Sequence, residues 1–275
     1  MFENNMWLGT ELYSGSFGKE YSFKEFNEQI SYALDIGVDK IDTAECYGFK
    51  EPIEELIGKS LNKKRNKVFL STKFGHIYKS QIKEESFEVD SVEKQFEESL
   101  KRLKTDYVDI YYFHSGNNVD FFNDKLWEML NKKKRDGAIG SLGLSLKHSL
   151  VIEKNYDQLL RAKEYGINTI QTVLNIFSKQ SLDFVIPFCK NNNLNIISRM
   201  PLAKGLLSGK YNIGHKFNLN DERSKDKIIT NKIISNNLRS ADEAIRWVKN
   251  YVSEIIIGSK DFQQMKSNFY SINNL

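Results

Sequence analysis

The chain is poor in the residues that cross-link or interrupt a fold, with two cysteines and three prolines among 275 residues. Cys46 and Cys189 are too few for a disulfide framework, and this scarcity is typical of a reducing compartment. No apolar run approaches the roughly 18 residues that a membrane-spanning helix needs. The N-terminal "MFENNMW" also lacks the charged and apolar regions of a signal peptide. We therefore expect a cytoplasmic protein without a membrane partner.

The chain also lacks a large excess of either charge. It has 40 lysines and arginines and 36 aspartates and glutamates, which gives a net charge of +4. This imbalance is too small to favour a nucleic-acid partner. Two basic stretches, "NKKRNK" (62–67) and "NKKKRDG" (131–137), precede predicted strands. They are expected to solvate connections or to stabilise a helix end rather than to bind phosphates.

No segment rich in proline, serine and glycine divides the chain; short apolar runs alternate instead with amphipathic stretches. The apolar runs predict eight strands, at 7–10, 40–42, 68–73, 108–114, 141–144, 169–173, 195–198 and 254–257. Helical spacing predicts helices at 22–36, 90–103, 126–136, 182–191 and 241–250. Gly58, Gly137 and Gly166 are expected where a helix ends before the next strand.

Alternation of strands and helices implies a parallel sheet with crossover helices. Eight such units in about 250 residues match a closed (β/α)8 TIM barrel, so residues 1–275 are predicted to form one α/β domain. An open doubly wound sheet is the competing fold, and for nucleotide binding it would need G-x-G-x-x-G after its first strand. The segments "SGSFG" (14–18) and "GAIGSLG" (137–143) lack that spacing, so the barrel is preferred.

Polar side chains follow three successive predicted strands. Asp42 ends the second strand and is followed by Tyr47, Lys73 ends the third, and His114 ends the fourth. Each has an ordinary structural interpretation, as a turn-forming aspartate, a packed tyrosine, a solvated lysine or a loop histidine. Because the catalytic groups of a barrel gather at the C-terminal ends of its strands, the four together favour a shared active site.

The sequence around these four residues resembles the aldo-keto reductase family. "GVDKIDTAECYGFKE" (37–51) is similar to that family's Asp-Thr-Ala and Tyr-Gly segment, "STKFG" (71–75) to its lysine strand, and "YVDIYYFHSG" (107–116) to its histidine strand. The likeness runs from "LGTEL" (8–12) almost to the end of the chain. It implies a (β/α)8 barrel with Asp42, Tyr47, Lys73 and His114 as the catalytic tetrad.

Such a tetrad can deliver a proton to a carbonyl oxygen. A free tyrosine has a pKa of about 10, too high for easy proton exchange at neutral pH, and an adjacent ammonium such as that of Lys73 is expected to lower it. Asp42 would hold Lys73 in place and charged, and His114 would donate a hydrogen bond that orients the carbonyl oxygen. Asp42 would thus serve Tyr47 through Lys73.

The resemblance also implies a nicotinamide cofactor, NADP(H) rather than NAD(H). "LGLS" (142–145) and "NTIQTVLN" (168–175) match the segments that hold the carboxamide, which points to Ser145 and Gln171, while Leu146 stands where an asparagine is usual. "IISRMPLAKGLLSGKY" (196–211) resembles the seventh strand and the cofactor-covering loop. Arg199 stands there where many members place an aromatic ring, and its planar guanidinium can also stack.

Near the C-terminus, "IIIGSKDFQQMKSNFY" (255–270) matches the family's adenosine-phosphate segment. Phosphate is expected beside a helix N-terminus, with Lys260 favouring NADP(H), and no metal is expected. The residues predicted to bind the cofactor are Gly9, Thr10, Asp42, Ser145, Gln171, Arg199, Pro201, Leu202, Gly258, Ser259, Lys260, Gln264 and Asn268.

The main prediction is an NADPH-dependent reductase of a small-molecule aldehyde or ketone, with sugars and their derivatives among the candidates, acting as a monomer or weak homo-oligomer. Two alternatives stay open. A non-enzymatic protein of the same fold could sense the cofactor or bind a partner, and it would bind the cofactor without turnover. A barrel lyase or hydrolase could use Lys73 as a Schiff base, and borohydride would trap it with its substrate.

Overall fold

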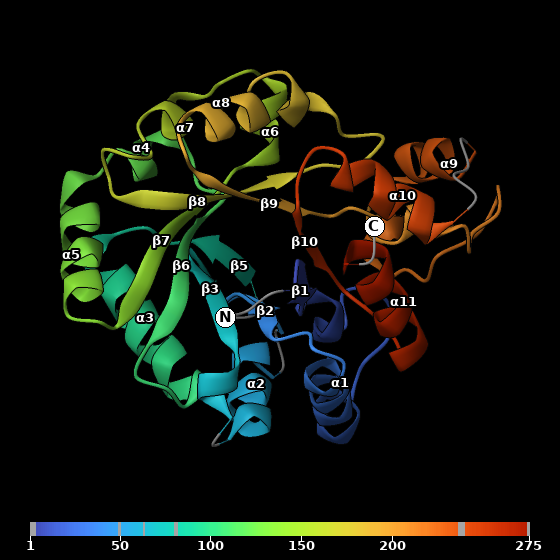
Figure 1. The fold of residues 1–275 in the computed structure, drawn as a ribbon, viewed down its shortest axis with the longest axis horizontal. Helices are drawn as coiled ribbons and strands as arrows, with labels where there is room; N and C mark the ends of the chain where they lie inside the picture. Colours follow the sequence, from blue (N-terminus) through green and yellow to red (C-terminus); the bar gives the residue numbers. More distant parts are fainter. Residues whose placement is uncertain (1–3, 49–50, 63, 80–81, 236–239, 274–275) are drawn as a thin grey trace.

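The computed structural model describes residues 4–48, 51–62, 64–79, 82–235 and 240–273. Within these ranges, eight parallel strands close into a barrel in the order β1-β10-β9-β8-β7-β6-β3-β2, and helices surround it (Figure 1). The predicted (β/α)8 barrel is therefore confirmed. Its strands are β1 (Met6–Gly9), β2 (Lys40–Asp42), β3 (Phe69–Phe74), β6 (Val108–His114), β7 (Ile139–Ser145), β8 (Ile167–Val173), β9 (Asn195–Arg199) and β10 (Glu254–Ile257).

The five predicted helices are present with their ends moved by a few residues, and further helices join them. The described helices are α1 (Phe23–Asp35), α2 (Ile53–Leu61), α3 (Val89–Leu103), α4 (Asn118–Phe121), α5 (Asp124–Arg135), α6 (His148–Ile152), α7 (Asp157–Leu160), α8 (Val185–Asn191), α9 (Lys227–Ser235), α10 (Ala241–Lys249) and α11 (Phe262–Asn273). None of them has the length and hydrophobicity of a bilayer-crossing segment.

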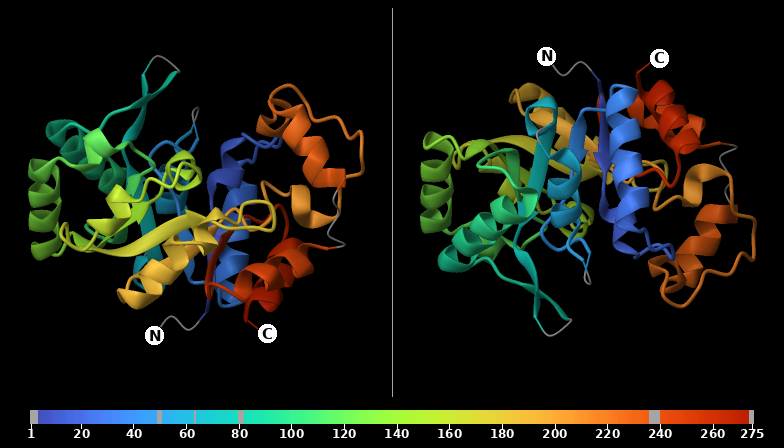
Figure 2. Two further views of the ribbon diagram at one scale, coloured as in Figure 1. Left: turned by 90° about the horizontal axis from the view of Figure 1, so that it is seen from above. Right: turned by 90° about the horizontal axis from the view of Figure 1, so that it is seen from below.

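Two features lie outside the regular alternation. Directly after β3, β4 (His76–Lys79) and β5 (Ile82–Glu85) form an antiparallel hairpin that was not predicted. Figure 2 shows this hairpin projecting from the body of the molecule, and α9 lying beyond the side of the barrel. Residues such as Met200, Tyr211 and Arg223, from the segment between β9 and α10, lie beside the C-terminal ends of several strands.

The helix α1 shows why local sequence produces these elements. Phe26, Ile30 and Ala33 recur at helical spacing and are buried. The Ser22 hydroxyl accepts a hydrogen bond from the Glu25 N–H, and the Glu25 carboxylate accepts one from the Ser22 N–H. This capping box satisfies donors that an uncapped helix start would leave unpaired, so the position of α1 follows from its own sequence.

The expected role of one glycine was wrong. Gly58 lies inside α2, which continues to Leu61. A Cβ at Gly58 would lie 2.2 Å from the carbonyl oxygen of Arg102 in α3, so glycine here permits close packing of two helices rather than ending one. Gly137 and Gly166, in contrast, have φ angles of 87° and 77° and precede β7 and β8 as predicted.

The register of the strands brings their carboxyl ends to one rim of the barrel. Gly9 of β1 lies opposite Asp42 of β2. His114 of β6 lies opposite Ser145 of β7, which in turn lies opposite Gln171 of β8. Side chains from distant parts of the sequence therefore meet at this rim, where barrel enzymes carry their chemistry.

Candidate active site

A cavity of about 200 Å³ opens at this rim. All eight barrel strands contribute a residue at or near their carboxyl end to its wall, namely Gly9, Asp42, Lys73, His114, Ser145, Gln171, Arg199 and Ile257. Tyr47, from the loop after β2, lines the same cavity. The structure therefore brings the four predicted catalytic residues together.

Lys73 is the centre of the polar contacts in this cavity. Its Nζ donates to Asp42 Oδ2 at 2.6 Å and to the Thr43 carbonyl oxygen at 2.7 Å, and it lies 3.5 Å from the hydroxyl of Tyr47. The side chains of Lys73 and Asp42 are 1% and 4% exposed. Because this ion pair is buried, removal of either partner would leave an uncompensated charge away from water.

The second carboxylate oxygen of Asp42 also has hydrogen-bond partners. Asp42 Oδ1 accepts hydrogen bonds from Ser71 Oγ at 2.8 Å and from Gln171 Nε2 at 2.7 Å. Asp42 is therefore held by two strands besides its own. Its carboxylate holds the ammonium of Lys73 by an ion pair, and no hydrogen bond joins it to Tyr47.

The electrostatic state of Tyr47 differs from expectation. We expected Lys73 to lower the pKa of Tyr47, but in the structure that pKa is raised well above its ordinary value of 10.0. Burial is the largest cause, followed by the carboxylates of Glu11 and Asp42, while Arg199 acts in the opposite direction. The expected lowering was wrong because the burial of Tyr47 and the nearby carboxylates of Glu11 and Asp42 outweigh the effect of the Lys73 ammonium. The phenol consequently stays protonated at neutral pH.

His114 is a neutral imidazole. Burial, followed by the charge of Lys73, lowers its pKa well below the ordinary 6.5. Its Nδ1 lies 3.9 Å from the sulfur of Cys46, and its ring stands at 83° to that of Tyr47, with 6.2 Å between the ring centres. With Nδ1 directed at Cys46, the second ring nitrogen is the one available to a substrate.

A buried acidic cluster lies behind the loop that carries Tyr47. The Arg102 guanidinium donates to Glu54 at 2.8 Å and lies 3.7 Å from both Glu45 and the more exposed Glu98. One cation is therefore shared by three carboxylates, of which Glu54 is fully buried and Glu45 largely buried. Glu45 Oε2 has no hydrogen-bond partner among the described residues. Burial, together with the charge of Glu54, raises the pKa of Glu45 to about 8.

The raised pKa of Glu45 predicts a pH-dependent stability. Between its ordinary value of 4.5 and about 8, folded Glu45 keeps a proton that the unfolded chain releases. The free energy of unfolding should therefore fall as the pH rises through this window, by up to about 1.4 kcal/mol per pH unit. Urea unfolding across the window measures the slope. Glu45→Gln should flatten it, whereas Glu98→Gln, which changes an exposed neighbour of the same arginine, should leave it near the wild-type value. A slope unchanged by Glu45→Gln contradicts this assignment.

At one end of the cavity, three buried polar atoms have no hydrogen-bond partner among the described residues: Ser145 Oγ, Gln171 Oε1 and Arg199 Nε. Gln171 is fixed by its bond to Asp42, which leaves its oxygen free to accept. A carboxamide offers two N–H donors and one carbonyl acceptor. The three atoms therefore fit the carboxamide of a nicotinamide cofactor, two as acceptors and one as donor.

The remaining predicted cofactor residues fall into two groups. Gly9, Thr10, Pro201, Leu202, Gly258, Lys260 and Gln264 line the cavity. Ser259 and Asn268, however, are buried behind its wall, where Asn268 Nδ2 donates to Ser259 Oγ at 3.0 Å. These two side chains therefore support the wall rather than form it.

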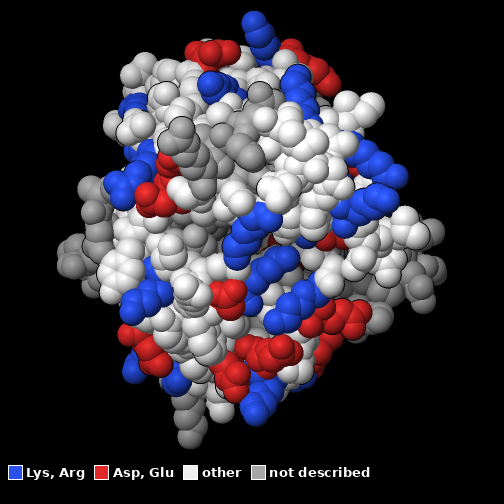
Figure 3. All heavy atoms as spheres, turned by 90° about the vertical axis from the view of Figure 1, so that its right-hand side faces the viewer, with Lys and Arg blue, Asp and Glu red and all other residues white. Residues whose placement is uncertain are grey.

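The helix N-terminus expected to receive phosphate is capped by the protein itself, since Asp261 accepts from the Gln264 N–H at 2.8 Å. Cationic side chains near this helix offer another site for phosphate. Lys210 and Arg223, which we did not predict, line the cavity together with Lys260. Burial, and then the charge of Arg223, lowers the pKa of Lys260. Figure 3 shows basic side chains gathered around a hollow on the side of the molecule that bears α9 and α10, which suits a phosphorylated ligand.

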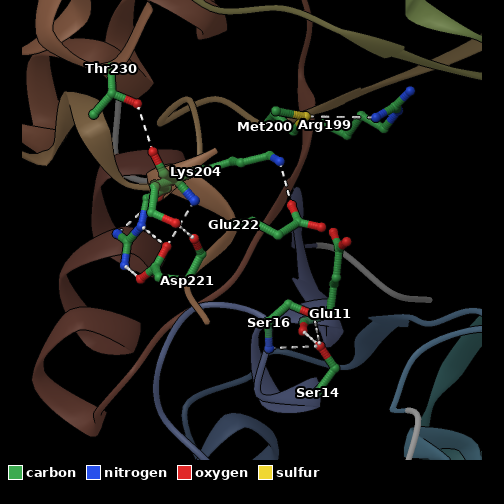
Figure 4. Close-up of polar contacts among 11 residues, drawn as sticks. Glu11, Ser14, Ser16, Arg199, Met200, Lys204, Asp221, Glu222 and Thr230 are labelled. Atoms are coloured by element: carbon green, nitrogen blue, oxygen red, sulfur yellow. Dashed lines mark hydrogen bonds and ion pairs between the residues drawn. The ribbon is translucent and has the colours of Figure 1, made fainter. Parts of the chain in front are cut away.

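The loop after β9 covers the end of the cavity that Lys210 and Lys260 line. Lys204 pairs with Glu222 at 2.5 Å, and the Glu222 N–H donates to the carbonyl oxygen of Ser16 at 3.0 Å. Figure 4 shows Lys204 reaching toward Glu222, with Glu11 and Ser16 nearby. The sequence indicated a covering loop, but the partners that hold it, from residues 14–18 and 221–223, carry no periodic signal that could have revealed them.

Comparison with known proteins agrees with this geometry. The model of the Aldo/keto reductase family matches residues 5–275. The aldo-keto reductase YhdN of Bacillus subtilis is 31% identical over 221 residues, which cover 80% of this chain and 64% of YhdN. The aldo-keto reductase yakc (NADP(+)) of Schizosaccharomyces pombe is 28% identical over 277 residues, which cover 90% of this chain and 78% of that protein. This chain thus spans less than two thirds of YhdN but more of yakc.

Solved structures show the same fold. A glycerol dehydrogenase from Gluconobacter oxydans superposes with a TM-score of 0.80 at 25% identity, covering 98% of this chain and 85% of that one. The holo form of an aldo-keto reductase from Bacillus halodurans gives a TM-score of 0.76 at 22% identity, covering 98% and 86%. Because the family model matches nearly the whole of this chain and the barrel is shared with these structures, the chain belongs to the aldo/keto reductase family.

Proposed function

We propose that this protein is an NADPH-dependent reductase that converts an aldehyde or ketone to an alcohol, with Tyr47 donating the proton. The observation that carries the proposal is a single cavity with two chemically distinct ends. One end holds Tyr47 beside the buried Lys73–Asp42 pair, and the other holds the cations Lys210 and Lys260. The name of the relative yakc, which includes NADP(+), supports the same cofactor.

In this proposal Tyr47 is a general acid. Its raised pKa keeps the phenol protonated at neutral pH, so the proton is available when negative charge develops on the carbonyl oxygen. The ammonium of Lys73, 3.5 Å from the phenol oxygen, stabilises the phenolate that remains. His114, being neutral, donates one N–H to the same carbonyl oxygen and orients it.

The same cavity has groups suited to each part of the cofactor. Bound there, a reduced nicotinamide would supply the reducing equivalents for the carbonyl carbon. Ser145, Gln171 and Arg199 would hold its carboxamide through the atoms that lack partners. Lys210 and Lys260 would neutralise phosphate charge at the other end.

The direct test is NADPH oxidation by the purified protein, followed by absorbance, across a panel of aldehydes, ketones and open-chain sugars. Three-carbon hydroxy aldehydes and ketones belong in the panel because a structural neighbour is named a glycerol dehydrogenase. We expect turnover with some members and formation of the matching alcohol. Tight NADPH binding with no turnover anywhere would instead indicate a cofactor sensor, and borohydride trapping without a cofactor would indicate Schiff-base chemistry at Lys73.

The choice of cofactor gives a second prediction. If Lys260 contacts the additional phosphate of NADPH, Lys260→Ala should weaken NADPH binding about ten- to hundredfold more than NADH binding, the amount expected for one charge-assisted hydrogen bond. Fluorescence titration with both cofactors measures this. Lys266→Ala, an exposed lysine of α11, is the matched control and should change neither affinity. Equal losses for the two cofactors in Lys260→Ala would show that the phosphate is recognised elsewhere.

A further inference from the structure

Arg199 places in the wall of the cavity a cation that has no ion-pair partner among the described residues. Its Nη2 donates to the carbonyl oxygen of Leu146 at 3.0 Å, its Nη1 lies 3.7 Å from the sulfur of Met200, and its buried Nε has no partner. Within the described part of the chain, no carboxylate lies within ion-pair distance of it. Figure 4 shows the side chain extending away from the Lys204–Glu222 pair. Arg199 therefore differs from Lys73, Lys204 and Arg223, each of which has a carboxylate partner.

The cation of Arg199 is also permanent. Burial lowers its pKa from 12.5, and the nearby Tyr47, Glu11 and Asp42 oppose that effect, but a guanidinium does not lose its proton in a protein at ordinary pH. Of the two carboxylates, Asp42 is already bound by Lys73. Glu11 acts on Arg199 through its charge, with no ion pair between the two side chains. Neither carboxylate is therefore a paired partner of Arg199.

Arg199 Nε is one of the three atoms in the cavity wall that are suited to hold a carboxamide. Ser145 Oγ and Gln171 Oε1 share the cavity wall and the lack of a partner with Arg199 Nε. If these atoms hold the carboxamide, as the proposed function requires, then the guanidinium lies at the nicotinamide ring as well. That ring is neutral in the reduced cofactor and positively charged in the oxidised one, so its interaction with a fixed cation depends on its oxidation state.

We propose that Arg199 makes this site discriminate between the oxidation states of its cofactor, by opposing the positively charged ring of NADP+ and accepting the neutral ring of NADPH. Like charges a few ångströms apart in a partly desolvated site repel strongly enough to change a binding constant by about ten- to hundredfold. The consequence is fast release of the oxidised product cofactor, which favours the direction of reduction. This inference rests on the proposed function and deepens it.

The test compares affinities for NADPH and NADP+, titrated on the same preparation by fluorescence or calorimetry. The quantity of interest is the ratio of the two dissociation constants, because partial misfolding of a variant lowers both affinities together and leaves the ratio unchanged. Arg199→Gln and Arg199→Tyr remove the charge and should lower the NADP+/NADPH ratio about ten- to hundredfold. Arg199→Lys keeps the charge and should retain most of the wild-type ratio.

Lys260→Ala is the control at the other end of the cavity. It should weaken NADPH and NADP+ alike, because the two forms carry the same phosphates. A ratio that Arg199→Gln and Arg199→Tyr leave unchanged overturns the inference, as does Arg199→Lys behaving like Arg199→Gln. Failure of the wild-type protein to bind either form is a different outcome, since it would overturn the proposed function itself.

Discussion

Tyr47→Phe is expected to reduce the rate of carbonyl reduction by roughly 10²–10⁴-fold while leaving the affinity for NADPH nearly unchanged. The size follows from the usual contribution of a positioned general acid. The phenol is the group in the cavity that is both protonated at neutral pH and adjacent to the buried ammonium of Lys73. Steady-state turnover with a carbonyl substrate, together with an NADPH titration, measures both quantities.

Tyr111→Phe is the matched control for this change. Tyr111 lies on β6, is fully buried, and its hydroxyl has no hydrogen-bond partner among the described residues. The same loss of one oxygen atom should there leave turnover close to the wild-type rate. Near-wild-type turnover in Tyr47→Phe, or equal losses in the two variants, would mean that Tyr47 is not the proton donor.

Lys73→Met has the second largest expected effect, on stability and activity together. It leaves the carboxylate of Asp42 buried without its cation, a change that costs about 3–5 kcal/mol of unfolding free energy in comparable buried pairs. Turnover should also fall, because Lys73 is the one described cation within hydrogen-bond distance of the Tyr47 hydroxyl that can stabilise its phenolate. Urea unfolding and turnover under conditions where the variant is folded give the two values.

A double variant separates the structural effect from the catalytic one. Adding Asp42→Asn to Lys73→Met removes the stranded charge, while the remaining amide oxygen can still accept from Ser71 and Gln171. Stability should partly recover, whereas turnover should not. Recovery of both would reduce Lys73 to a structural partner of Asp42 and would contradict its role beside Tyr47.

The barrel was predictable because its signals are local. Apolar runs and helical spacing each depend on a few neighbouring residues, and capping of the kind seen at Ser22 adds to them. The hairpin of β4 and β5 was missed because its strands, such as "HIYK", are short and lack clear alternation. The packing role of Gly58 was missed because its reason, the backbone of α3, lies more than forty residues away in the sequence.

The residues of the candidate site were predictable where they lie at strand ends or in segments that resemble the family. Asp42, Tyr47, Lys73 and His114 meet because parallel strands share one rim. The direction of the pKa shift of Tyr47 could not be predicted from the sequence, because it depends on burial and on Glu11 from another loop. Likewise, the burial of Ser259 and Asn268 and the contribution of Lys210 depend on how the chain folds around the last helix.

The central claim is that this cavity couples NADPH to carbonyl reduction through Tyr47. Its most direct test is a single-turnover experiment in which protein preloaded with NADPH is mixed with members of the carbonyl panel, and loss of NADPH and formation of alcohol are measured together. We predict equal amounts of the two in the wild-type protein and neither on the same timescale in Tyr47→Phe. NADPH that stays bound and unreacted with every carbonyl compound in the panel would contradict the account.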